Sequence, residues 1–249
     1  MALLDDINGK KRALDAARPL PVEVVGELAD RFERELTIAC VTVEDAGLTP
    51  EEVLFVLGRG AVLRNRPAAA QRLVLNHAQA LTLMARLAYE PGAVTERMVA
   101  AFHGVLFQGL DADAGKYRDA PLPDEGEAAD PAKIRVSMSA LGGWLRRTEA
   151  GVETALEAHH RLMIVRPFAR GNPAVALLIM NLILNRAGYP PVAVRPDDLQ
   201  VYADTVARAR MVGDKLPWRE VMLRLLNRSL DDCLEALAAA GAAKAEKAS

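Results

Sequence analysis

The residues of this chain best suited to bind a ligand lie in one short segment, residues 166–173, which reads Arg-Pro-Phe-Ala-Arg-Gly-Asn-Pro and runs directly into an apolar stretch at 174–184. The guanidinium groups of Arg166 and Arg170 stay protonated at physiological pH. Asn172 can cap a helix and Pro173 suits its first position, so we predict that a helix begins there. Because a helix N-terminus carries partial positive charge, the segment predicts a cationic concavity that binds an anion without a metal ion.

A second interpretation of the same two arginines needs no ligand. Arg166 and Arg170 would then be solvent-facing side chains without a functional role. Residue types alone leave both interpretations open.

His159 and His160 precede this segment and are candidate catalytic bases, because the pKa of histidine lies near neutral pH. Adjacent residues of a helix point to different faces, so the two side chains cannot easily share a metal ion. Helix packing or surface exposure is the alternative interpretation of both. We interpret His77 and His103 as structural, and with only two cysteines in the chain we predict no metal site.

Segment 166–177 resembles the active-site loop of the Fic (filamentation induced by cAMP) family, whose pattern is HxFx(D/E)GNGRxxR. Pro167, Phe168, Gly171 and Asn172 fit that pattern. The positions that carry the family's chemistry depart from it. The sequence has Arg166 for the base histidine, Arg170 for the acidic metal ligand, Pro173 for the second glycine, and Ala174 and Leu177 for two phosphate-binding arginines.

Other segments resemble Fic motifs and occur in the expected order. Residues 114–118, Ala-Gly-Lys-Tyr-Arg, are similar to the (A)GxxR segment that precedes the family's substrate-aligning flap. Residues 36–46 are similar to its inhibitory helix, with Glu44 at the inhibitory glutamate. Further similarity at 75–81, 187–191 and 201–203 extends the resemblance over roughly residues 30–235.

The resemblance implies an enzyme that moves the AMP of ATP onto a protein hydroxyl with the help of Mg²⁺. Arg166 cannot accept the proton of that hydroxyl, because its guanidinium does not deprotonate. A cationic Arg170 would repel Mg²⁺. We therefore expect standard adenylyltransferase activity to be absent, Mg²⁺ binding of the family type to be lost, and no cofactor. The candidate ligand residues are Arg166, Arg170, Gly171, Asn172 and Arg118.

Glu44 would reach the second motif arginine in an autoinhibited member of the family. That position is Leu177 here, so this ion pair cannot form. Pairing with Arg166 or Arg170 and simple surface exposure remain as alternatives for Glu44.

Helical periodicity along the chain and the family resemblance predict an all-α fold. Thr49, Pro50 and Glu52 form a capping-box pattern at a helix start. Acidic residues and prolines interrupt the helical pattern at 111–136, and we expect a small flap or hairpin near 117–136. A short strand could also form at 191–194.

We expect residues 1–249 to form a single Fic-like domain of about eight to ten helices, with a core at about 30–235. Residues 36–46 would be the inhibitory-helix-like segment and 166–173 the active-site-like loop. The apolar stretch at 174–184 would be a buried central helix, and 241–249 a frayed C-terminal tail.

Composition narrows the classes of partner. A net charge of −2 gives no general attraction to nucleic acid or to a membrane surface. The N-terminal residues lack the features of a signal peptide, and the longest apolar run is too short to span a bilayer, so we expect a cytoplasmic protein. We expect a small anionic or nucleotide ligand or a protein partner, and leave a homo-oligomer open.

We predict a degenerate Fic-like protein whose former active-site cleft binds an anionic, nucleotide or protein ligand. The alternative is a divergent enzyme that uses the same cavity for another reaction on a phosphorylated or carboxylated substrate, with Arg166 and Arg170 as electrostatic groups.

Overall fold

The computed structural model describes residues 2–60, 62–122 and 130–248, and within these ranges the side chains from residue 3 to residue 244. Within these ranges the chain forms ten α-helices and no strand, which confirms the predicted all-α class. In chain order the elements are α1 (Ala2–Ala16), α2 (Val22–Val43), α3 (Pro50–Arg59), α4 (Ala68–Tyr89), α5 (Glu96–Leu106), α6 (Pro131–Leu145), α7 (Val152–Val165), α8 (Asn172–Arg186), the 3-10 helix η1 (Pro196–Asp198), α9 (Leu199–Met211) and α10 (Leu216–Ala248).

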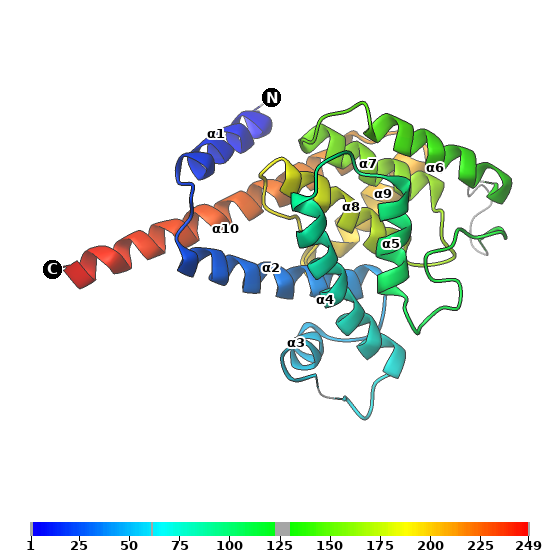
Figure 1. Cartoon of the computed structure of the whole chain (residues 1–249), viewed down its shortest axis with the longest axis horizontal. Coiled ribbons are helices and arrows are strands. Elements are labelled where there is room, and N and C mark those ends of the chain that lie inside the picture. Colours follow the sequence, from blue (N-terminus) through cyan, green and yellow to red (C-terminus); the bar gives the residue numbers. More distant parts are fainter. Residues whose placement is uncertain (1, 61, 123–129, 249) are drawn as a thin grey trace.

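Helix α8 lies at the centre of the molecule and the other helices pack around it (Figure 1). It contacts α7 most extensively, and also α4, α5 and α2. All residues from Ala174 to Leu184 are buried and all except Asn181 are apolar, so this is a buried central helix, as predicted for the stretch 174–184. The loop before α8 is therefore attached to a helix that is buried along most of its length.

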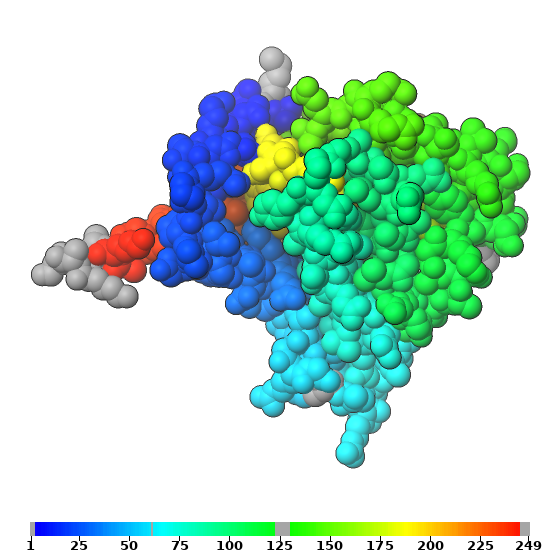
Figure 2. Space-filling view, viewed as in Figure 1, coloured from blue at the N-terminus to red at the C-terminus, as the bar shows by residue number. Residues whose placement is uncertain are grey.

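Helix α1 packs along α10, on the opposite side of the molecule from α6 (Figure 1). The segment that contains α3 projects from the rest of the surface, as Figure 2 shows in cyan. In the described parts of the chain, no helix combines the length and the apolar character needed to cross a membrane.

Charged side chains fasten α2 to the C-terminal part of the chain. The Arg195 guanidinium, which precedes η1, lies 2.9 Å from a carboxylate oxygen of Glu35 in α2 and 2.9 Å from one of Asp232 in α10. Arg31 in α2 also pairs with Asp232, at 2.6 Å. These ion pairs hold α2, whose last turn leads to Glu44.

The predicted capping box at the start of α3 is present. The Glu52 N–H donates to the Thr49 hydroxyl at 3.3 Å, and the Thr49 N–H donates to the Glu52 carboxylate at 2.9 Å. Two otherwise unpaired backbone donors are thus satisfied locally.

The region expected to form a flap or hairpin is partly helical. Helix α6 begins at Pro131, because the Asp130 side chain accepts from the Ala132 N–H and proline suits the first turn. The prediction was therefore wrong for 131–136. Residues 117–122 form no regular structure, and the rest of the expected flap, 123–129, lies outside the described residues.

Two other segments differ from expectation. Residues 192–194 are buried but form no strand, because the Asn181 side chain binds both the N–H and the carbonyl oxygen of Val192, at 2.8 and 3.0 Å. The expected frayed tail is helical from 241 to 248, within α10. Alanine, lysine and glutamate dominate that stretch, and all three favour helix over coil.

Candidate functional site

The loop between α7 and α8 begins and ends with a residue in the left-handed backbone region. Arg166 has φ 45° and its N–H donates to Leu162 O at 2.8 Å, which closes the last turn of α7. Pro167 follows and cannot continue the helix. Gly171 has φ 77° and directly precedes α8, so the chain reverses direction between the two helices.

Asn172 ties the loop together. Its side-chain oxygen accepts from the Phe168 N–H at 3.0 Å, and its side-chain nitrogen donates to Phe168 O at 2.8 Å. The predicted N-cap role of Asn172 was wrong, because both polar atoms of its amide are used within the loop. Gly171 is the N-cap residue, and Asn172 and Pro173 belong to the first turn of α8.

A stack of rings supports the loop from α5. The His103 ring stacks on Phe168 with 3.9 Å between centroids and on Phe107 with 4.8 Å. Its Nδ1 accepts from the Gly115 N–H at 2.8 Å, so its Nε2 carries the proton and donates to Arg170 O at 3.2 Å. Burial lowers the pKa of His103 to about 4, and the ring stays neutral at physiological pH. These contacts agree with the structural role expected for His103.

Arg118 is buried against the loop. Its Nε donates to Arg166 O at 2.9 Å and its Nη1 to Ala120 O at 2.8 Å, while its backbone N–H donates to Pro167 O at 2.9 Å. The side chain therefore braces the loop through backbone carbonyls, a contact that the sequence did not indicate. Its expected contact with a ligand stays a prediction.

Glu44 is the C-cap residue of α2, and its side chain reaches the start of α8. Its Oε1 accepts from the Ala174 N–H at 3.2 Å, in the first turn of that helix. Burial raises the pKa of Glu44, and the Ala174 N–H together with the positive charges of Arg170 and Arg166 opposes part of this rise. The half-buried carboxylate thus binds a backbone N–H, which neither sequence-based alternative included.

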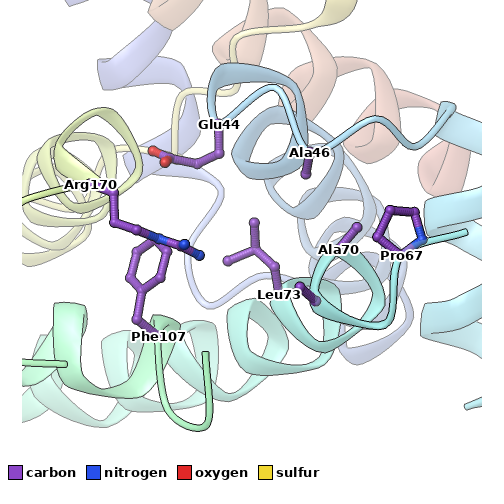
Figure 3. A pocket seen from close by; sticks show the side chains of 8 residues that line it. Glu44, Ala46, Pro67, Ala70, Leu73, Phe107 and Arg170 are labelled. Carbon is purple, nitrogen blue, oxygen red and sulfur yellow. The ribbon is translucent and has the colours of Figure 1, made fainter. Parts of the chain in front are cut away.

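Arg170 extends over the ring of Phe107, with its guanidinium carbon 4.6 Å from the ring centroid. Arg170 and Glu44 line the same cavity, of about 350 Å³, with their charged ends on one side of it (Figure 3). The structure therefore brings one predicted anion-binding residue and the predicted inhibitory-like residue to a single space. Phe107 was not singled out from the sequence, because nothing local relates it to a loop some 60 residues further along the chain.

The two candidate bases, His159 and His160, lie on α7 beside aromatic residues of α9 and α10. The Nε2 of His159 is 2.9 Å from the Tyr202 hydroxyl, and its ring stacks on Trp218 at 5.4 Å. Burial lowers the pKa of His159 to about 3 and also lowers the pKa of the half-buried His160, which lies beside Trp218. Neither is among the described residues that line the cavity beside Arg170. Their catalytic role stays a prediction.

The residues at the loop do not fit a magnesium site. Mg²⁺ requires oxygen ligands, usually carboxylates, and position 170 presents a guanidinium group instead. Over the described ranges, no three His, Cys, Asp or Glu residues gather in a way that could hold a metal ion. Leu177, at the position of the second family arginine, is buried near Leu36 and Cys40.

Comparison with known sequences identifies proteins that are similar to this chain. The model of the Fic/DOC family matches residues 93–184. The protein adenylyltransferase Fic of Nematostella vectensis is 27% identical over 184 residues, which cover 69% of this chain and 43% of the relative. That of Culex quinquefasciatus is 33% identical over 105 residues, 41% of this chain and 21% of the relative. The chain thus spans less than half the length of these curated relatives.

Solved structures show the same fold. A Fic domain containing signaling protein from Bacteroides thetaiotaomicron superposes with a TM-score of 0.83 at 21% identity, over 94% of this chain and 98% of that one. Fic-1 from C. elegans gives a TM-score of 0.85 at 19% identity, over 96% of this chain and 72% of that one.

Proposed function

Because the chain carries a Fic family domain, we propose that it is a degenerate member without standard adenylyltransferase activity, whose former active-site cleft binds an anionic, nucleotide or protein ligand. The single observation that carries this proposal is the hydrogen bond from the Ala174 N–H to Glu44 at 3.2 Å. The start of α8 therefore donates a backbone N–H to a carboxylate. An external anion could take the same place.

The missing chemistry supports the negative half of the proposal. AMP transfer needs a base for the attacking hydroxyl, and the guanidinium of Arg166 stays protonated in the working pH range. It also needs Mg²⁺ to neutralise the phosphates, and Arg170 cannot supply an oxygen ligand. The phosphate contacts of two arginines are absent as well, because their positions are Ala174 and Leu177.

The charge distribution supports the positive half. The Ala174 N–H at the start of α8 binds the Glu44 carboxylate, and the positive charges of Arg170 and Arg166 favour its ionised form. An incoming anion would have to displace that carboxylate or share its donors. Affinity for anions should therefore rise when Glu44 is removed.

The first test is AMP labelling of the purified protein and of lysate proteins with labelled ATP and Mg²⁺. We expect no labelling, and none after Arg166→His, because the metal and phosphate ligands are still missing. Robust labelling that disappears in Asn172→Ala would overturn the proposal.

The second test follows thermal stability in the presence of pyrophosphate and ADP. We expect stabilisation of equal size in EDTA and in Mg²⁺, weaker at high salt because screening reduces Coulomb attraction. Arg166→Ala and Arg170→Ala should each reduce the binding free energy by about 1.5–3 kcal/mol, the usual contribution of a hydrogen bond to a charged group.

A matched pair of variants tests whether Glu44 opposes the thermal stabilisation by pyrophosphate. Glu44→Ala should increase the stabilisation by pyrophosphate. Glu33→Ala changes the net charge equally at an exposed position of α2 and should leave it unaltered. If neither ligand stabilises any of these proteins, the cleft is not an anion site.

A further inference from the structure

The cavity beside Glu44 and Arg170 is lined by two charged residues and otherwise by apolar residues. Its volume is about 350 Å³, within the range of sites for small molecules. Glu44 and Arg170 are the only charged residues among its described lining residues. The others are apolar and come from the turn after α2, the start of α4 and the end of α5: Ala46, Pro67, Ala69, Ala70, Leu73 and Phe107.

Arg170 is an exposed residue, and two contacts orient it at the cavity. Its backbone oxygen is bound by His103, and its guanidinium lies on the face of Phe107. The Phe107 ring lies between His103 and Gly171. A Cβ atom added to Gly171 would lie only 2.1 Å from Phe107 Cε2. Within the described residues the guanidinium makes no hydrogen bond or ion pair, so its N–H groups remain for a ligand in the cavity.

Glu44 presents a negative charge to the same space. Its Oε1 is bound to the Ala174 N–H, and the carboxylate has further acceptor positions. Figure 3 shows the Glu44 side chain turned toward the start of α8 and the Arg170 side chain extending from the loop toward Leu73, with Ala70 further along the cavity.

This pairing of charges selects among ligands. A simple anion is attracted by Arg170 and repelled by Glu44, and a simple cation meets the reverse. A molecule that carries both charges a few ångströms apart satisfies both residues without displacing Glu44. Attraction at both ends and repulsion of the singly charged competitors together give specificity.

We propose that this cavity binds a small zwitterion with an apolar body, namely a free α-amino acid with an aliphatic or aromatic side chain. Its carboxylate would bind the Arg170 guanidinium and its ammonium group would bind Glu44. Its side chain would pack against Leu73, Ala70 and Pro67. The inference rests on the proposed function, because it takes Arg170 as a ligand-binding residue.

The test compares each amino acid with its two halves by calorimetric titration of the full chain. L-leucine is set against 4-methylpentanoate, which lacks the ammonium group, and 3-methylbutylamine, which lacks the carboxylate. L-phenylalanine is set against 3-phenylpropanoate and 2-phenylethylamine. We expect at least one amino acid to bind about tenfold or more tightly than both of its halves, since each half loses a charge-assisted hydrogen bond.

Variants then locate the site. Glu44→Gln should weaken binding of that amino acid about tenfold or more while strengthening binding of pyrophosphate, so the two effects have opposite signs. Arg170→Gln should weaken both. Arg72→Gln removes an exposed arginine of α4 outside the cavity and should change neither.

The outcomes separate the two proposals. If neither amino acid binds more tightly than its halves, or if Glu44→Gln leaves amino-acid binding unchanged, the zwitterion site is overturned, while the pyrophosphate response still stands for the proposed function. If neither pyrophosphate nor ADP stabilises any of the proteins, or if AMP labelling occurs that disappears in Asn172→Ala, the proposed function fails on a measurement that does not involve amino acids.

Discussion

Glu44 is a half-buried carboxylate at the end of α2, close to the positive charges of Arg166 and Arg170. Burial raises its pKa above the ordinary value of 4.5, and the neighbouring donors do not fully offset that rise. The folded state therefore holds the Glu44 proton more tightly than the unfolded state. A group of this kind lowers the free energy of unfolding as pH rises from its ordinary pKa through its folded pKa.

We predict that Glu44→Gln removes this pH dependence. The free energy of unfolding of the wild type, minus that of the variant, should fall as pH rises through that window and stay level above and below it. Urea unfolding at a series of pH values measures the difference. A difference that rises with pH would mean that the folded protein stabilises the charged form of Glu44.

Gly171 permits the close contact between the loop and α5. A Cβ atom there would lie 2.1 Å from Phe107, and the backbone has φ 77°. We predict that Gly171→Ala costs about 1–2 kcal/mol for the left-handed backbone and about 1–3 kcal/mol more for the collision. The measurement is the free energy of unfolding in urea.

Gly213→Ala is the matched control for this substitution. Gly213 has φ 72°, but nothing lies within 4 Å of its added Cβ atom. Only the backbone cost should appear there. In a Phe107→Ala background the additional cost of Gly171→Ala should disappear, and its persistence would show that the ring is not its cause.

At the scale of single elements, α8 both fills the core and supplies the first turn beneath the loop. Its residues Leu178 and Ile183 are each 2% exposed. Amphipathic helices tolerate a charge on one face, whereas this helix has no such face between 174 and 184.

We predict that Leu178→Asp and Ile183→Asp each unfold the domain, because an unpaired buried charge costs several kcal/mol of a total stability of about 5–15 kcal/mol. Circular dichroism and gel filtration detect the loss of fold. Val136→Asp, in α6 at 71% exposure, should change stability by less than about 0.5 kcal/mol. Folded core variants would contradict the central position of α8.

At the scale of the whole molecule, ion pairs between side chains that are distant in sequence hold α2 in place. Arg195 contacts both Glu35 and Asp232, and the Asp232 side chain is only 9% exposed. Because α2 ends at Glu44, this cluster contributes to the position of the carboxylate at the start of α8.

We predict that Arg195→Ala lowers the free energy of unfolding by about 1.5–3 kcal/mol, because a buried carboxylate loses a charged donor. Arg208→Ala breaks a more exposed pair with Asp214 and should cost less than about 1 kcal/mol. Urea unfolding of both variants provides the comparison. Equal costs would show that burial of Asp232 does not matter.

Local patterns in the sequence predicted the all-α class, the capping box at Thr49 and the buried helix at 174–184. Each of these depends on residues within a few turns of one another, where periodicity and capping rules apply. The same reasoning located the candidate loop by its arginines, glycine and asparagine. It wrongly assigned Asn172 to a helix cap. The Asn172 amide can make its hydrogen bonds either as a cap or within the loop, and the residue type alone does not distinguish these two roles.

Only the tertiary structure decided which charges and rings meet at the loop. Glu44 reaches the Ala174 N–H from a position 130 residues earlier, and Arg170 rests on Phe107 from α5. Such contacts depend on the relative placement of α2, α5 and α8, which follows from packing of the whole core. No spacing along the chain encodes them. The sequence therefore determined that the loop is cationic, and the fold determined that a carboxylate shares its cavity.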